Sequence, residues 1–281
     1  MIVTDAQVHL WEAHRPDRPW PSPVSPPPWP HRPEPLGGEE MLQLMREAGV
    51  GRAVIVPPSW AGDHNDTALE IVVAHPTHFA IMGRFEPRAP GALDRLPTWL
   101  DQPGMLGIRL SLHHGPSRVW LDGGTLEHFW PAAERFGIPL MVYVPGLCRL
   151  IAPIAERHPD LRLVIDHLAR PIRTKDAPAW ADLDEVLALA RFPNVTVKVS
   201  SLPTYTSESY PFPSLDAPIR RVYDHFGPQR MMWGSDLTKL PCSYRECLDH
   251  FRVALDFLSE SDREWILGRT AATVLRWPEP S

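Results

Sequence analysis

The chain has 281 residues, of which 43% are hydrophobic, enough for one large α/β domain or two small ones with a buried core. The formal net charge is -6, so no basic surface points to nucleic acid or a membrane as the partner. No apolar run approaches the roughly 20 residues that span a bilayer, and MIVTD lacks the pattern of a secretory signal. Three cysteines without a CxxC pair give no disulfide framework. We therefore expect a cytoplasmic globular protein.

Short β-branched, apolar runs alternate along the chain with segments of helical periodicity. The predicted strands cover residues 2–10, 52–58, 79–85, 105–111, 139–144, 161–167, 194–200 and 230–236. Eight strand and helix units in about 250 residues match the size of a TIM barrel. A doubly wound open sheet is the alternative, but no GxGxxG or Walker-type loop follows the first strand. The pattern therefore predicts an α/β protein, a (β/α)8 TIM barrel that forms a single domain over residues 1–281.

Residues 11–38 interrupt this pattern with a long Pro/Trp-rich loop after the first strand. The segment holds ten of the 34 prolines and no helical periodicity, which is typical of a disordered linker. It also carries Trp11, Trp20 and Trp29, which linkers rarely contain. In a barrel, a loop after a strand lies at the carboxyl end, where active sites form. We therefore expect an ordered lid over the barrel mouth, with Trp11 or Trp20 near the pocket.

The first and seventh predicted strands carry polar side chains that must face the barrel interior. Successive side chains of a strand alternate between its two faces. On the first strand this predicts Asp5, Gln7 and His9 inside, opposite Ala6 and Val8. On the seventh it predicts Thr196, Lys198 and Ser200 inside, opposite three valines. A lysine in a barrel interior needs a partner, and Asp5 is the candidate.

Further polar residues fall at the ends of other predicted strands. Residues 161–167 end in His167, expected to share a face with Leu163 and Ile165 and to lie opposite Asp166. Residues 230–236 end in Asp236, and Arg109 and Tyr143 lie near the ends of their strands. Any one of these is typical of a hydrogen-bonded core residue. Together they gather at the carboxyl ends of the strands, where a TIM barrel holds its chemistry.

Four stretches in this order, DAQVHLW, VIDHLARP, KVSSL and MMWGSD, resemble the amidohydrolase-related branch of the amidohydrolase superfamily. Within that branch the chain is most similar to the lactonase group, which includes 2-pyrone-4,6-dicarboxylate lactonase and sugar-acid lactonases. The resemblance extends over nearly the whole chain. It implies a distorted TIM barrel and a hydrolase acting on a small molecule.

The sequence departs from the family pattern at the metal site. A full site there uses two His on the first strand, His on the fifth and sixth, and an Asp on the eighth. Here Gln7 replaces the first His and Tyr143 takes the fifth-strand place, which leaves His9, His167 and Asp236. Three ligands can hold zinc, but a Gln amide is a poor ligand beside imidazole. We expect no metal cofactor, with one divalent ion such as zinc on those three residues as the alternative.

Lactone hydrolysis needs a deprotonated water, a polarised carbonyl and a protonated leaving oxygen. The resemblance makes Asp236 the general base and gives His9 and His167 the task of hydrogen bonding to the carbonyl. It places Gln7, Arg109, Tyr143 and Arg170 in substrate binding, where an arginine suits a carboxylate.

Two other function classes stay open at this point. The first is a metal-dependent decarboxylase or hydrolase of aromatic or unsaturated acids, as found among relatives of this branch. The second is a non-catalytic binding protein on a degenerate barrel, which the retention of Asp236 and His9 disfavours. We expect a small-molecule substrate as the only partner, apart from a possible homo-oligomer.

Overall fold

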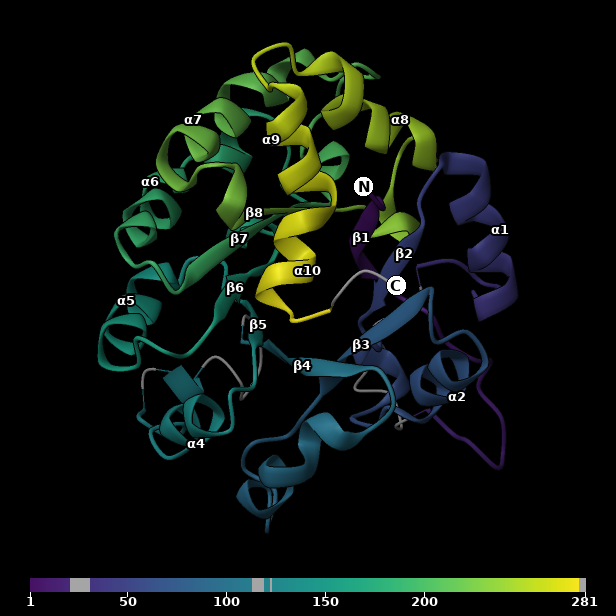
Figure 1. Cartoon of the computed structure of the whole chain (residues 1–281), viewed down its shortest axis with the longest axis vertical. Helices are drawn as coiled ribbons and strands as arrows, with labels where there is room; N and C mark the ends of the chain where they lie inside the picture. Colours follow the sequence, from purple (N-terminus) through teal and green to yellow (C-terminus); the bar gives the residue numbers. More distant parts are fainter. Residues whose placement is uncertain (21–30, 113–118, 122, 278–281) are drawn as a thin grey trace.

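A computed structural model of the chain describes residues 1–20, 31–112, 119–121 and 123–277. Eight parallel strands pair in the order of the sequence, from β1 to β8, and curve into a barrel (Figure 1). Their bounds are β1 Thr4–Val8, β2 Arg52–Ile55, β3 Phe79–Arg84, β4 Met105–Ser111, β5 Leu140–Tyr143, β6 Leu163–Ile165, β7 Val195–Ser200 and β8 Met231–Gly234. The predicted TIM-barrel fold is confirmed, and each predicted strand run contains one of the observed strands.

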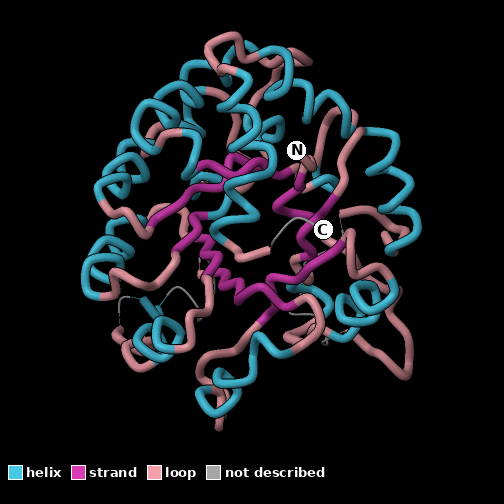
Figure 2. The backbone as a smooth tube through the Cα atoms, in the orientation of Figure 1, coloured by secondary structure: helices cyan, strands magenta, loops and turns pink. Residues whose placement is uncertain are grey.

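Helices surround the strands on the outside of the barrel (Figure 2). They are α1 Gly38–Ala48, α2 Asp66–Ala74, α4 Phe129–Arg135, α5 Cys148–Arg157, α6 Leu183–Leu187, α7 Asp216–Phe226, α8 Tyr244–Asp249, α9 Glu260–Glu264 and α10 Thr270–Val274. After β3 the outer position is taken by the irregular 3-10 segment Leu93–Asp101, which contains Pro97. None of the helices in the described part of the chain is long and apolar enough to cross a membrane.

Helix α1 illustrates how the sequence sets an outer helix. Its apolar residues recur at helical spacing, so that Met41, Leu42 and Met45 are buried against the barrel. The helix ends at Gly49, whose φ of 83° lies in the left-handed region that favours glycine. The chain then turns directly into β2.

The barrel interior is apolar toward the amino ends of the strands. One buried cluster joins alternate residues of the strands to the last helix, and it contains Ala6, Val54, Val56, Ala80, Met82, Met141, Val164, Met232, Ala271, Leu275 and Trp277. Trp277 lies against the guanidinium of Arg52 at the start of β2, 4.5 Å from ring centre to Cζ. Helix α10, yellow in Figure 1, lies across this end of the barrel. The carboxyl end is left for polar side chains.

Strand β1 departs from simple alternation at the seam with β8. Its pairing with β2 shifts register between Asp5 and Val8, so Ala6 packs inside the barrel rather than outside as expected. The Gln7 carbonyl accepts from the Asp236 amide at 2.9 Å. The Asp5 carboxylate faces this seam, where it accepts from the Ser235 amide at 2.8 Å.

Asp5 is therefore not the partner of Lys198, contrary to the expectation from the sequence. Its carboxylate accepts from the Tyr244 hydroxyl at 2.7 Å and joins β1 to α8. Lys198 lies inside the barrel as predicted, but its ammonium pairs with Asp166 Oδ1 at 2.7 Å. The register shift explains the error, because it turns Asp5 away from the interior.

The face predicted for β6 is also wrong. Leu163 and Ile165 belong to the outer core, whereas Val164 and Asp166 point into the barrel. His167 reaches the same end because the chain leaves the strand in a left-handed turn, with φ of 53° at His167. Alternation of faces applies only within the strand, and β6 ends at Ile165.

Candidate active site

Three predicted site residues meet at the carboxyl end of the barrel. His9 follows β1, His167 follows β6 and Asp236 follows β8, and all three side chains are buried. His9 Nε2 lies 3.3 Å from Asp236 Oδ1, and His167 Nε2 lies 3.8 Å from Asp236 Oδ2. The sequence prediction that these residues come together agrees with this geometry.

Sharp backbone turns set the directions of the His167 and Asp236 side chains. Asp236 has φ of 55°, as His167 has 53°, so both leave their strands in the left-handed region. Such conformations cost energy for residues other than glycine and cluster at functional sites. Gly234 permits the close approach of β8 to β1, because a Cβ there would lie 3.1 Å from the Gln7 amide nitrogen. This explains the glycine in the MMWGSD stretch.

Gln7 stands where the family pattern has a histidine, and its side-chain amide contacts both His9 and Lys198. His9 Nδ1 lies 2.6 Å from the Val56 carbonyl, which can only accept, so Nδ1 carries the hydrogen. His9 Nε2 then presents a lone pair, 3.2 Å from the Gln7 amide nitrogen. The Gln7 oxygen accepts from the Lys198 ammonium at 2.5 Å, which fixes the orientation of the amide. The hydrogen bonds from Lys198 to Gln7 and from Gln7 to His9 thus hold His9 in one tautomer.

A cluster of buried charged residues adjoins the hydrogen bonds that link Lys198, Gln7 and His9. Asp166 pairs with Lys198 on one oxygen and accepts from Arg109 Nε at 3.1 Å on the other. Burial raises the pKa of Asp166, but the two cations outweigh it and lower the pKa to about 2. The carboxylate is therefore ionised, and it keeps both cations in place.

Asp236 has one paired and one unpaired oxygen. The Lys239 ammonium donates to Oδ2 at 2.8 Å, whereas Oδ1 has no hydrogen-bond donor among the described residues and is buried. Burial raises the pKa of Asp236, but Lys239, together with His9 and His167, holds it well below the usual range. Asp236 is thus an ionised carboxylate with a lone pair available to a water or substrate.

His167 offers the complementary hydrogen-bond donor. Its Nδ1 lies 2.8 Å from the Ser200 hydroxyl, which can donate to that nitrogen. Nε2 then carries the hydrogen and faces the Asp236 carboxylate, which is the favourable arrangement. The Tyr143 ring lies edge-on to His167 at 5.4 Å between centres and limits its movement.

The residues predicted to bind substrate already make contacts within the protein. Arg109 is buried, bound to Asp166 and to the Ser111 hydroxyl, with its guanidinium over the Tyr143 ring. The Tyr143 hydroxyl donates to the Arg170 carbonyl at 2.6 Å, so its hydrogen is not directed at a substrate.

Arg170 is fully buried and its guanidinium serves the loop after β6. It donates to the carbonyls of Leu168 at 2.8 Å and Ala179 at 2.7 Å and pairs with Asp182 at 2.5 Å. The expectation that Arg170 grips substrate directly is not supported by these contacts. The loop that follows VIDHLARP folds back on its own arginine, which the sequence motif does not reveal.

Two residues near the site were missed from the sequence. Lys239 lies one turn after Asp236, and that spacing in WGSDLTK was a signal for the pair. His31, in the Pro/Trp-rich segment, has its ring 5.3 Å from the His9 ring and 4.5 Å from that of Trp60. No periodic pattern surrounds His31, so nothing in the sequence pointed to it.

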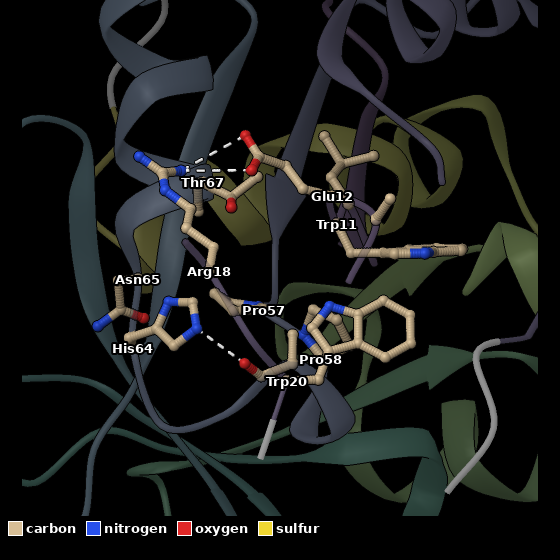
Figure 3. A pocket seen from close by; sticks show the side chains of 13 residues that line it. Trp11, Glu12, Arg18, Trp20, Pro57, Pro58, His64, Asn65 and Thr67 are labelled. Atoms are coloured by element: carbon tan, nitrogen blue, oxygen red, sulfur yellow. Dashed lines mark hydrogen bonds and ion pairs between the residues drawn. The ribbon is translucent and has the colours of Figure 1, made fainter. Parts of the chain in front are cut away.

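The described ends of the Pro/Trp-rich segment lie at the carboxyl end of the barrel. Trp11 is buried and packs edge-on to Trp60 at 5.5 Å. Trp11 and Trp20 line a small cavity of about 30 Å³ together with Pro57 and Pro58 (Figure 3). The expected lid also includes residues 21–30, with Trp29 among them, and this part of the prediction lies outside the described residues.

The buried histidines His31, His167 and His250 have a lowered pKa and should make the fold less stable in acid. Burial lowers the pKa of His31 and His250 to about 4 and that of His167 to about 3, against 6.5 as the ordinary value. Their contribution is thus present above pH 6.5 and is lost as the pH falls toward the folded-state pKa. Each should remove about 2 kcal/mol of unfolding free energy between pH 7 and pH 5. Urea unfolding at both pH values measures this. A free energy that rises toward pH 5 would contradict these pKa shifts.

The sequence profile of the amidohydrolase family matches residues 4–277. The chain belongs to the amidohydrolase family. An L-fucono-1,5-lactonase of Burkholderia ambifaria is 32% identical over 248 residues, which cover 83% of this chain and 79% of that protein. The family and this relative confirm that the chain is an enzyme, a hydrolase of lactonase type, rather than a non-catalytic binding protein.

Solved structures of similar fold extend over the whole barrel. One is an amidohydrolase from Burkholderia multivorans with bound zinc, at a TM-score of 0.81 and 21% identity, covering 99% of this chain and 100% of that one. Another, from Acinetobacter baumannii, is described as a probable 2-pyrone-4,6-dicarboxylic acid hydrolase with citric acid bound. It has a TM-score of 0.77 and 15% identity and covers the same shares of both chains. These likenesses show the fold of this amidohydrolase.

Two neighbouring donors contact the residues that the family pattern gives to a metal ion. In the part of the chain that the structure describes, no three His, Cys, Asp or Glu side chains are grouped to hold a metal ion. Gln7 directs amide hydrogens at His9 Nε2, and Lys239 directs its ammonium at Asp236. Both donors point at lone pairs that a metal ion would need.

Proposed function

We propose that this amidohydrolase opens the ring of a small lactone by hydrolysis without a metal ion. The observation that carries the proposal is the buried, ionised Asp236, whose Oδ1 has no donor among the described residues and lies 3.3 Å from His9 Nε2. A buried carboxylate oxygen without a partner calls for a hydrogen donor beside it. A water molecule fills that need and is the nucleophile of lactone hydrolysis.

The reaction uses Asp236 first as a base and then as an acid. Its carboxylate takes a proton from the water, whose oxygen attacks the lactone carbonyl carbon. The His167 Nε2 hydrogen stabilises the negative charge that develops on the carbonyl oxygen. The bond from the carbonyl carbon to the ring oxygen then breaks, and Asp236 returns its proton to that leaving oxygen. The product is a hydroxy acid.

His9 has a different task from the one expected from the sequence. With its hydrogen on Nδ1, a neutral His9 cannot donate to the carbonyl through Nε2. Its single Nε2 lone pair instead accepts a hydrogen, from Gln7 at 3.2 Å in this structure and from the water that Asp236 activates when that water takes the place of the amide. His9 thereby orients the nucleophile, while the carbonyl contact falls to His167.

Lys239 supports the metal-independent assignment through charge. Its ammonium already neutralises one Asp236 oxygen at 2.8 Å, and a dication in the same place would be repelled by it. Gln7 in place of a metal-binding imidazole acts in the same direction. The substrate contacts of Gln7 and Arg109 remain part of this proposal, whereas Tyr143 has its hydrogen on the Arg170 carbonyl and could meet a substrate only as an acceptor.

Restoring the missing imidazole should damage this enzyme rather than improve it. We expect Gln7→His to bind zinc through two imidazoles on one strand, because His9 and Asp236 lie within reach. That ion would occupy the base, so kcat should fall about tenfold or more and recover when a chelator removes the metal. Gln43→His, on the exposed face of α1, is the matched control. Zinc-dependent activity above that of the native enzyme would contradict the proposed site.

A screen of sugar-acid lactones and pyrone carboxylates with purified enzyme tests the proposal. We expect hydrolysis of at least one lactone, followed as acid release. Loss of carbon dioxide from an aromatic acid, without lactone hydrolysis, would favour the metal-dependent decarboxylase instead. Three further expectations belong to this proposal: a single domain over residues 1–281, a possible homo-oligomer, and a cytoplasmic location. The three free thiols support the cytoplasmic location.

A further inference from the structure

We propose that His31, from the Pro/Trp-rich segment, is a positioning residue of the active site that holds the Asp236 turn through Thr238. The inference rests on the proposed function of Asp236 as the base. In this proposal a residue of the loop after β1 positions the catalytic turn after β8. Neither the motifs of the sequence nor the strand ends point to this residue.

The contact joins segments that are far apart in the chain. His31 Nδ1 lies 2.6 Å from the Thr238 hydroxyl, a hydrogen bond across 207 positions of sequence. Thr238 is the middle residue of the 3-10 turn Leu237–Lys239, which directly follows Asp236. The bond therefore ties the Pro/Trp-rich segment to the turn that aims the base.

The turn is also held by its backbone, since the Asp236 amide donates to the Gln7 carbonyl and the Lys239 amide to the Asp236 carbonyl, both at 2.9 Å. Asp236 has a left-handed φ of 55°, and the turn brings the Lys239 ammonium back onto the Asp236 carboxylate. A left-handed conformation of a residue with a Cβ persists only when its surroundings hold it. His31, by fixing Thr238, supplies one such restraint between the carboxylate and its counter-ion.

The His31 ring is itself held by aromatic neighbours at the site. It lies edge-on to His9 at 5.3 Å and to Trp60 at 4.5 Å, with Trp11 at 6.5 Å. Burial lowers the pKa of His31 to about 4, so the ring is neutral near pH 7 and does not repel Lys239. The His31 ring thus packs against His9 while its Nδ1 bonds to the Asp236 turn through Thr238.

A double-mutant cycle tests this assignment in the intact enzyme. His31→Phe keeps a ring but loses the hydrogen bond, and Thr238→Val removes the other partner. We expect each to lower kcat about tenfold with KM nearly unchanged, because a misaimed base slows the step without weakening binding. The double variant should be no slower than either single one, since both remove the same bond. His31→Asn, which can still bond to Thr238, should recover most of kcat.

His14→Phe is the matched control. His14 lies in the same segment, also packs edge-on to a tryptophan, and accepts from the Trp20 amide at 3.0 Å. We expect it to leave kcat and KM unchanged. If His31→Phe does not fold, Thr238→Val against Thr238→Ser carries the test alone. Native kcat in Thr238→Val, additive losses in the double variant, or a rise in KM alone would each overturn the proposal.

A second measurement separates this proposal from the proposed function. If the native enzyme hydrolyses no lactone, the function fails, and the positioning role is read from the ring ¹⁵N resonances of labelled histidine. His167 faces Asp236, and its contacts within the described part of the chain do not include His31, so its Nε2 signal should move in both His31→Phe and Thr238→Val only through Asp236. It should stay in place in His14→Phe. An unmoved His167 signal in the first two variants would overturn the positioning role.

Discussion

Asp236→Asn should lower kcat by about 10²–10⁴ and change KM little, which is the usual effect of losing a positioned general base. The amide keeps the shape of the side chain and a hydrogen-bond acceptor but cannot take a proton from water. Steady-state kinetics on the lactone found by the screen measures both constants. The variant also loses the negative charge that Lys239 pairs with, so its folding should be checked by thermal unfolding.

Asp224→Asn provides the matched control for that variant. Asp224 is an exposed carboxylate that pairs with Arg220 on helix α7, outside the barrel (Figure 2). We expect native kcat and KM, because an exposed pair of this kind contributes at most about 1 kcal/mol to stability. Turnover of Asp236→Asn within a few fold of the native value would rule out Asp236 as the base.

Lys198→Met should lower the free energy of unfolding by about 3–5 kcal/mol, because it leaves Asp166 without one of its two buried cations. The same change removes the donor to the Gln7 oxygen, so the chain that fixes the His9 tautomer is broken. Urea unfolding measures the first effect. The second should appear as a lower kcat under conditions where the variant is fully folded.

A compensating variant separates the ion pair from simple packing. Lys198→Met with Asp166→Asn removes both charges, and we expect it to recover part of the lost stability. Lys239→Met is the surface counterpart, because its partner is buried but the lysine itself is 35% exposed. Equal stability of native enzyme and Lys198→Met would show that the buried pair contributes nothing.

The barrel could be predicted from the sequence because its signal is local and repeated. Each strand is a short β-branched run, and each valine of β7 lies in the outer core with Lys198 inside, as alternation requires. The failures came where a strand is not regular. A register shift in β1 turned Asp5 to the seam, and the early end of β6 reversed the faces of Asp166 and His167.

The site could be predicted only in part, for a related reason. His9, His167 and Asp236 are found from their places at strand ends, which is a rule of the fold. The partner of a buried charge is a matter of tertiary geometry, so the pairing of Lys198 with Asp166 was not accessible. His31 depends on how an irregular segment returns to the barrel, and no spacing rule describes such a segment.

The most direct test of metal-independent lactone hydrolysis is the rate of the native enzyme after its metal has been removed. The protein is treated with a chelator, passed through metal-free buffer, analysed for bound metal, and assayed on the lactone that the screen identifies. We expect substoichiometric metal and an unchanged rate, because Asp236 and His167 carry the chemistry and Lys239 supplies the positive charge. An enzyme that becomes inactive on this treatment and regains its rate with Zn²⁺ or Mn²⁺ would contradict the account.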